Sequence, residues 1–303
     1  MTLVVAVAAA ESVWMMADRQ LGDGSTGATR LARKLAFVAP TADTTAIVGY
    51  SGLGRTASGV EPSDWIVSSL RGRQLGLGDH MAVLAEAAKN RLPPHLAEFD
   101  EGLRSHAFFA VAFEQENLVA YSIEVSERSE GPDGYEVALS EWTARDRRRC
   151  CQVFAIGSGR ETIDRIDGWA ECLRSIVKAY DRGRVTASCV ADHMADLNWR
   201  CSNKNRTVGK NSIVAWRNRP DGAHSDGGAH RLYVRKSLQR NTPPLPTLAG
   251  SIDFDLLDNA TERLDRDYFA AVWRGEEPSF DSYVDAIREA AAQVDNRPDD
   301  RLP

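Results

Sequence analysis

The stretch that decides how this chain folds is TLVVAVAAAESVWMMADRQLGDGSTGATRLARK, residues 2–34. It contains two short runs of valine and other small or apolar residues, at 3–8 and 13–17, separated by a polar Glu-Ser pair. Short apolar runs rich in β-branched residues around a polar break are typical of a buried hairpin. The first run has no basic region before it and is soon interrupted by Glu11, so we interpret it as a strand and not as a secretory signal.

The residues around this hairpin suggest nucleophilic chemistry. A threonine hydroxyl is a weak nucleophile, and placing it at the chain start allows its own α-amine to act as the base. The small side chain of Thr2 favours removal of Met1, which would create that arrangement without a propeptide. Asp18 follows the second run and Lys34 precedes the next apolar run, at 35–38. A buried lysine needs a carboxylate partner, although a surface ion pair after a hairpin would explain each of these two residues taken singly.

The rest of the chain alternates between strand-like and helix-like periods. With 303 residues, 43% of them hydrophobic, it can fill one large core or one core plus an appendage. The order of strands, two helices, strands, two helices and strands predicts an α+β fold, a four-layer αββα sandwich, although order alone leaves other α+β folds open. Strands are predicted at 44–50, 107–113, 118–125, 135–139, 152–156, 212–216 and 231–234, and helices at 65–70, 81–92, 163–177 and 185–199.

The composition divides the chain into three predicted parts. Residues 1–236 form the body, 237–250 a proline-rich linker containing NTPPLPTL, and 251–303 an acidic, partly helical C-terminal extension. The extension has 14 acidic residues against 6 arginines, so most of the net charge of -6 lies there and the body is nearly neutral. Helical pieces of the extension are predicted near 262–273 and 283–293.

Composition also argues against several classes of protein. A nucleic-acid partner is not expected, because no face gathers the lysines and arginines that displace counterions from phosphates. No apolar run approaches the roughly 20 residues that cross a bilayer, so no membrane partner is expected. Five cysteines without disulfide or zinc spacing fit a cytoplasmic location, and neither a cofactor nor a metal is predicted. His224 and His230 flank a glycine-rich loop without a completing ligand set, so a turn is the favoured interpretation.

Taken together, these residues resemble a known family. Asp18 and Lys34 stand sixteen and thirty-two residues after Thr2, and the turns YSGLG (50–54) and FAIGSG (154–159) follow in order. This pattern resembles the proteasome β subunit and the peptidase subunit of the bacterial two-component ATP-dependent protease. Both are threonine peptidases of the N-terminal-nucleophile (Ntn) hydrolase superfamily. The resemblance covers about 2–216 and leaves the C-terminal extension unexplained.

The resemblance implies a role for each site residue. Thr2 would be the nucleophile, Lys34 the cation that lowers nearby pKa values, and Asp18 the group that orients Lys34. A backbone N–H near Gly52 would stabilise the oxyanion. Ser158 would contact the terminal amine. A peptide or protein substrate, a homo-oligomeric ring and an ATPase or other protein partner are implied in the same way.

One departure from the family pattern weakens the expected activity. The relatives carry an aspartate and then a serine before the last strand of the body, where this chain has Asn205 and Val208. Loss of that carboxylate would remove a group that helps to position the amine, unless Asp196 replaces it. The main hypothesis is therefore a threonine peptidase. The alternatives are an Ntn amidase for a small amide, and an inactive assembly or interaction protein that docks a partner through its acidic extension.

Overall fold

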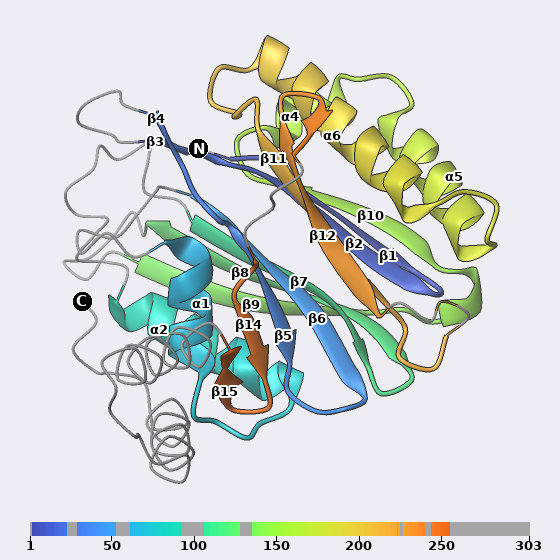
Figure 1. Cartoon of the computed structure of the whole chain (residues 1–303). Coiled ribbons are helices and arrows are strands. Elements are labelled where there is room, and N and C mark those ends of the chain that lie inside the picture. The colour runs from blue at the N-terminus through green and yellow to red at the C-terminus, as the bar shows by residue number, and fades with distance from the viewer. Residues whose placement is uncertain are drawn as a thin grey trace, which may run out of the picture.

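The computed structural model describes residues 2–22, 29–52, 61–91, 106–127, 135–222, 224, 227–239 and 244–254. Two large sheets and a two-stranded ribbon combine with helices, which confirms the predicted α+β class (Figure 1). The helical pieces predicted at 262–273 and 283–293 lie outside the described residues. Among the helices that are described, none is long and apolar enough to cross a membrane.

The first sheet is built around the predicted N-terminal hairpin. Its strand order is β10-β1-β2-β11-β12-β13, and every neighbouring pair in it is antiparallel. The hairpin pairs Val4 with Ala17 across β1 and β2. The strands are β1 (Val4–Ala9), β2 (Ser12–Asp18), β10 (Cys151–Ile156), β11 (Ser212–Asn218), β12 (Gly228–Val234) and β13 (Ser237–Leu238).

The second sheet has the strand order β15-β14-β5-β6-β7-β8-β9 and is antiparallel except where β14 runs parallel to β5. The separate ribbon pairs β3 (Gln20–Gly22) with β4 (Thr29–Leu31) and joins the two sheets along the chain. The other strands are β5 (Leu35–Ala39), β6 (Thr44–Ser51), β7 (His106–Glu114), β8 (Asn117–Glu127), β9 (Tyr135–Thr143), β14 (Thr247–Ala249) and β15 (Ile252–Asp253).

The helices form two groups, each packed on its own sheet (Figure 1). α1 (Pro62–Leu70) and α2 (Leu77–Arg91) pack on the second sheet. α4 (Arg160–Asp164), α5 (Trp169–Asp181) and α6 (Ala187–Lys204) pack on the first, and a 3₁₀ turn spans Arg147–Arg149. The single helix predicted at 163–177 was wrong, because Gly168 adopts a left-handed conformation with φ of 65° that separates α4 from α5.

The strand β1 is buried on both faces. Val4, Ala6 and Ala8 join the core between the two sheets, whereas Val5 and Val7 join the core beneath the helices of the first sheet. Successive strand residues point to opposite faces, so a strand covered on both sides has no polar positions. This explains why the N-terminal run is apolar throughout.

The end of the described chain returns to the start of the second sheet. In β14, Thr247 pairs with Phe37 of β5, and the N–H of Phe37 donates to the carbonyl of Pro246 at 2.9 Å. Both β13 and β14 fall within 237–250, where the sequence predicts a linker. The division of the chain into a body, a linker and an extension stays a prediction.

Candidate active site

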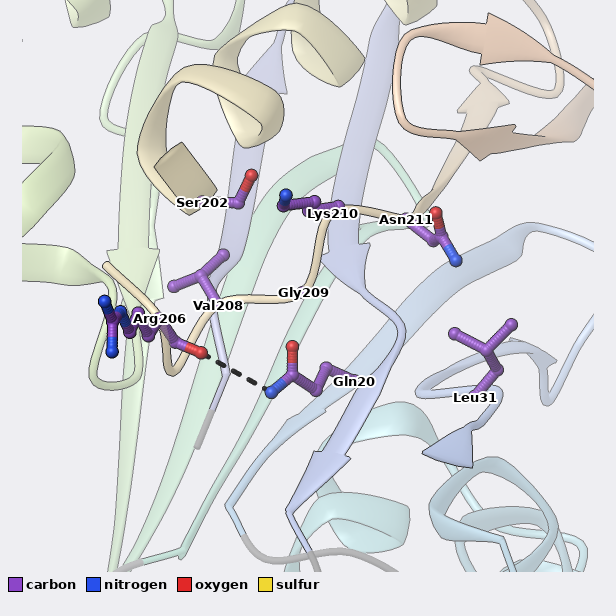
Figure 2. A pocket seen from close by; sticks show the side chains of 8 residues that line it. All are labelled: Gln20, Leu31, Ser202, Arg206, Val208, Gly209, Lys210 and Asn211. Carbon is purple, nitrogen blue, oxygen red and sulfur yellow. Dashed lines mark hydrogen bonds between the residues drawn. The ribbon is translucent and has the colours of Figure 1, made fainter. Parts of the chain in front are cut away.

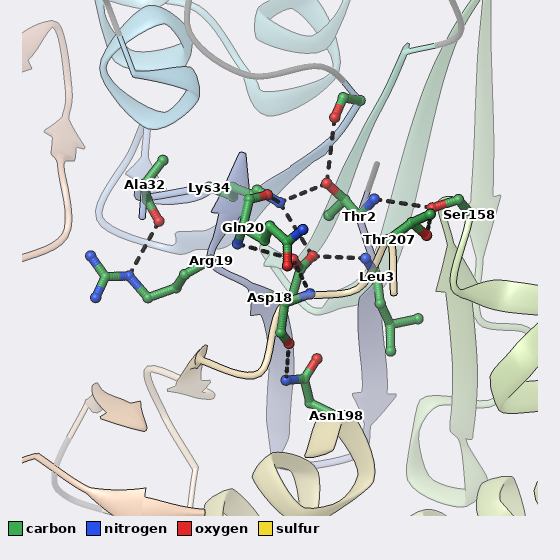
Figure 3. A network of polar contacts seen from close by, with 12 residues as sticks. Thr2, Leu3, Asp18, Arg19, Gln20, Ala32, Lys34, Ser158, Asn198 and Thr207 are labelled. Atoms are coloured by element: carbon green, nitrogen blue, oxygen red, sulfur yellow. Dashed lines mark hydrogen bonds and ion pairs between the residues drawn. The ribbon is translucent and has the colours of Figure 1, made fainter. Parts of the chain in front are cut away.

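Thr2 and Lys34 come from different sheets and meet. Thr2 directly precedes β1 in the first sheet, and Lys34 directly precedes β5 in the second. The ammonium group of Lys34 donates a hydrogen bond to Thr2 Oγ1 at 2.6 Å (Figure 3). The whole of Thr2 is buried and Lys34 is 1% exposed. The nucleophile candidate and the cation candidate therefore share one dry space.

The segment before Lys34 is fixed on helix α1. The guanidinium of Arg33 pairs with Glu61 at 3.2 Å and with Asp64 at 3.1 Å, both at the N-terminal end of that helix. The backbone N–H of Arg33 also donates to Glu61, at 3.0 Å. These contacts join the entry to β5 with the helix that covers its sheet, and so they define where Lys34 begins.

The Lys34 ammonium has three acceptors, one for each of its N–H bonds. They are Thr2 Oγ1 at 2.6 Å, the carbonyl oxygen of Gln20 at 2.6 Å and Asp18 Oδ1 at 3.2 Å. Burial lowers the pKa of Lys34, and the charge and hydrogen bond of Asp18 act in the opposite direction. An ammonium group has three donors and no acceptor, so Thr2 Oγ1 accepts this bond and keeps its own proton for another partner.

The Asp18 carboxylate is surrounded by donors. Besides Lys34, Oδ1 accepts from the N–H of Leu3 at 2.8 Å, and Oδ2 accepts from the N–H groups of Gln20 at 3.0 Å and Gly209 at 2.9 Å. The side chains of Asp18 and Lys34 are both fully buried. Four donors suit a carboxylate that is charged and that holds β1, the ribbon and the 205–209 loop in one place.

Two glycine turns close around Thr2. Its hydroxyl lies 3.5 Å from the carbonyl oxygen of Gly52, and its backbone nitrogen donates to Ser158 Oγ at 3.2 Å. Beside Ser158, Gly157 has a φ of 89°, and a Cβ there would lie 2.2 Å from the carbonyl oxygen of Thr2. Only glycine fits that position. The oxyanion role predicted for the N–H near Gly52 stays a prediction.

The loop after α6 also reaches Thr2, through Ser158. Thr207 Oγ1 lies 3.1 Å from Ser158 Oγ, and Asn205 Oδ1 accepts from both the hydroxyl and the N–H of Thr207, at 2.7 and 3.0 Å. Val208 is 2% exposed and belongs to the core beneath the helices. Asp196 instead pairs with Lys236 at 3.3 Å, at a half-exposed position outside this network.

A cavity of about 330 Å³ lies between this loop and the ribbon (Figure 2). Gln20 and Gly209 line it, and their backbones are the same groups that hold Asp18. The Gln20 side chain donates across the cavity to the carbonyl oxygen of Arg206 at 3.5 Å. The other lining residues are Leu31, Ser202, Val208, Lys210 and Asn211.

The described part of the chain contains no group of three metal-ligating side chains. His224 stacks on Tyr180 with ring centroids 4.2 Å apart, and His230 lies against Phe37 at 6.0 Å. The two histidines on either side of the glycine-rich loop therefore contact different aromatic rings. The described residues give no support to a metal site at this loop.

Comparisons with known proteins place the fold only distantly. No protein-family model and no curated protein matches the chain. Anbu (ancestral beta-subunit) from Yersinia bercovieri matches 75% of this chain and 86% of its own, with 13% identity and a TM-score of 0.44. Anbu from Hyphomicrobium sp. strain MC1 matches 92% and 99%, with 14% identity and a TM-score of 0.45. A structure titled as the helical assembly of the Anbu complex from Pseudomonas aeruginosa matches 92% and 98%, with 13% identity and a TM-score of 0.44.

These findings correct the assignment suggested by the N-terminal motifs. The assignment to the proteasome β subunit and the bacterial two-component peptidase was wrong, because the similar solved structures are Anbu proteins at 13–15% identity. Spacings of a few residues along one hairpin do not separate such related groups. The chemistry of the site is therefore argued below from its own contacts.

Three contributors to the site were missed in the sequence. The carbonyl of Gln20 and the N–H of Gly209 act through the backbone, so their side chains carry no signal. Thr207 stands between the two positions that were compared with the family pattern and was not considered. All five predicted site residues, Thr2, Asp18, Lys34, Gly52 and Ser158, do lie together around the start of β1.

Proposed function

We propose that this protein is a threonine-type N-terminal-nucleophile hydrolase that cleaves amide bonds in peptides. The supporting observation is the 2.6 Å contact between Lys34 Nζ and Thr2 Oγ1, with Asp18 bound to the same ammonium at 3.2 Å. A cation at this distance stabilises the alkoxide character that Thr2 develops as it attacks. Every group in the contact is buried, which strengthens the interaction relative to water.

The reaction needs the α-amine of Thr2, so Met1 must first be removed. Thr2 Oγ1 then attacks the substrate carbonyl carbon while the α-amine takes the hydroxyl proton. The amine passes that proton to the leaving nitrogen as the C–N bond breaks, and an ester on Thr2 remains. Water hydrolyses the ester, with the amine again acting as the base, and releases a carboxylic acid. We assign the oxyanion to the backbone N–H near Gly52.

The same proposal extends to architecture and partners. We propose that the two sheets and their helix groups form the four-layer αββα sandwich of Ntn hydrolases, with the body at 1–236, a linker at 237–250 and an extension at 251–303. A homo-oligomeric ring, an ATPase or other protein partner and a cytoplasmic location remain part of the proposal. Their support is the sequence pattern described above.

Two competing functions are tested by the same experiment. An Ntn amidase would act on a small amide, and the cavity of about 330 Å³ is at the lower end of the volumes of small-molecule sites. An inactive assembly protein would keep the fold without turnover, a view favoured by the neutral side chain of Asn205 near the amine.

The test compares the unaltered chain with Thr2→Ala and Thr2→Ser. Intact mass first establishes whether Met1 is removed from each chain. Peptide libraries and small amides are then incubated with the three proteins, and cleavage is followed by mass spectrometry. We expect turnover by the unaltered chain, partial turnover by the serine variant and none by the alanine variant, with equal melting temperatures. Full activity in Thr2→Ala, or retention of Met1 by an active protein, would rule out the mechanism.

A further inference from the structure

The loop at 205–207 forms a hydrogen-bonded chain with a single direction. It runs from the nitrogen of Thr2 to Ser158 Oγ at 3.2 Å, on to Thr207 Oγ1 at 3.1 Å, and ends at Asn205 Oδ1 at 2.7 Å. Each hydroxyl in it could act as donor or acceptor when taken alone. The direction is nevertheless fixed by the groups at the Asn205 end.

The orientation of the Asn205 amide is set by partners that have only one role each. Its nitrogen donates to the carbonyl oxygen of Ser158 at 3.2 Å, and a carbonyl can only accept. Its oxygen faces the backbone N–H of Thr207 at 3.0 Å, and that group can only donate. A third contact, from the amide nitrogen to Thr162 Oγ1 at 3.0 Å, agrees with this orientation. Asn205 Oδ1 is therefore the acceptor at the end of the chain.

The direction of every other bond follows from that end. Thr207 gives its hydroxyl proton to Asn205, so it must accept from Ser158. Ser158 gives its proton to Thr207, so it can only accept from the Thr2 nitrogen. An amine that donates to Ser158 keeps its lone pair free of this contact. The free lone pair is what the amine needs in order to take the proton from Thr2 Oγ1.

We propose that Thr207, anchored by Asn205, is a positioning residue that prevents Ser158 from donating to the terminal amine and so keeps the lone pair of that amine available to Thr2 Oγ1. The inference rests on the proposed function, because it needs a free amine on Thr2. Thr207 acts through Ser158 and touches neither the substrate nor the nucleophile. Without its hydroxyl, Ser158 is released to turn its own proton toward the amine.

The experiment compares Thr207→Val, which removes the hydroxyl at nearly constant shape, with Thr207→Ser, which keeps it. The full chain is freed of Met1 with methionine aminopeptidase. The pKa of the α-amine is then measured from the pH dependence of its acetylation by trace acetic anhydride, read from the mass of the N-terminal peptide. This readout does not depend on turnover. The kcat for the best amide substrate is measured beside it.

We expect Thr207→Val to lower the pKa of the amine by about half a unit or more, because a hydroxyl that donates to the lone pair stabilises the neutral form. In the same variant kcat should fall at least about tenfold, since the base is occupied. Thr207→Ser should keep both values. An unchanged amine pKa in Thr207→Val, with kcat within twofold, overturns the proposal. A processed chain that cleaves no amide overturns the proposed function instead, and the amine pKa alone then decides the role of Thr207.

Discussion

Replacing Asp18 by asparagine tests the electrostatics of the site most directly. The substitution keeps the shape of the side chain but leaves one acceptor atom where four donors now meet two. Lys34 would keep a fully buried cation without a charged partner. Breaking a buried ion pair from one side costs about 3–5 kcal/mol, out of a total of about 5–15 kcal/mol for a typical domain. Asp18→Asn should therefore destabilise the protein strongly.

The opposite half of the pair should matter less to stability. In Lys34→Met, Asp18 still accepts from the N–H groups of Leu3, Gln20 and Gly209, so its charge stays hydrogen-bonded. We expect a loss of about 1–3 kcal/mol. The double variant Asp18→Asn/Lys34→Met contains no uncompensated cation and should be more stable than Asp18→Asn alone.

Urea unfolding of the full chain gives these free energies, provided that the transition is two-state. The matched control is Asp196→Asn, the same substitution in the exposed pair with Lys236, where a loss of no more than about 1 kcal/mol is expected. The reasoning is refuted if Asp18→Asn costs no more than this control. It is also refuted if adding Lys34→Met to Asp18→Asn lowers stability further.

Two other predictions concern the same site. Gly157→Ala should destabilise the protein by at least about 2 kcal/mol more than Gly183→Ala, because both glycines have positive φ but only the first Cβ would collide with Thr2, at 2.2 Å, while the second meets nothing within 4 Å. Thermal unfolding of the two variants measures the difference, and equal losses would contradict the packing argument. The alkaline limb of kcat/KM should lie below the ordinary lysine pKa of 10.5, because burial lowers the pKa of Lys34 and the cation is lost as pH rises through that value. A limb at or above pH 10.5 would show that the charge on Lys34 is not required.

The sequence predicted the elements whose pattern is set by burial. The runs at 3–8 and 13–17 are buried on both faces, so their apolar character marks them as strands of the core. The prediction failed at 163–177, where the apolar spacing continues across a turn and only the backbone of Gly168 reveals the break. The parallel pairing of β14 was missed because three residues within a proline-rich stretch carry no strand period.

The site divides in the same way. Thr2, Asp18 and Lys34 could be proposed from their types, because an N-terminal hydroxyl and a buried ion pair each need particular side chains. The groups that hold them, such as the carbonyl of Gln20 and the N–H of Gly209, belong to the main chain. Their positions depend on how the ribbon and the 205–209 loop fold back, which no local pattern encodes.

The parallel strand β14 has a practical consequence for anyone who shortens this protein. A chain ended at residue 236 would lose the ladder beside Phe37 and uncover the main chain of the strand that starts next to Lys34. Bare main-chain groups along a sheet border recruit other chains, so such a truncation should precipitate and lose the geometry around the lysine at once. Truncation after residue 254 keeps that border covered and is the better starting point for dissecting the extension.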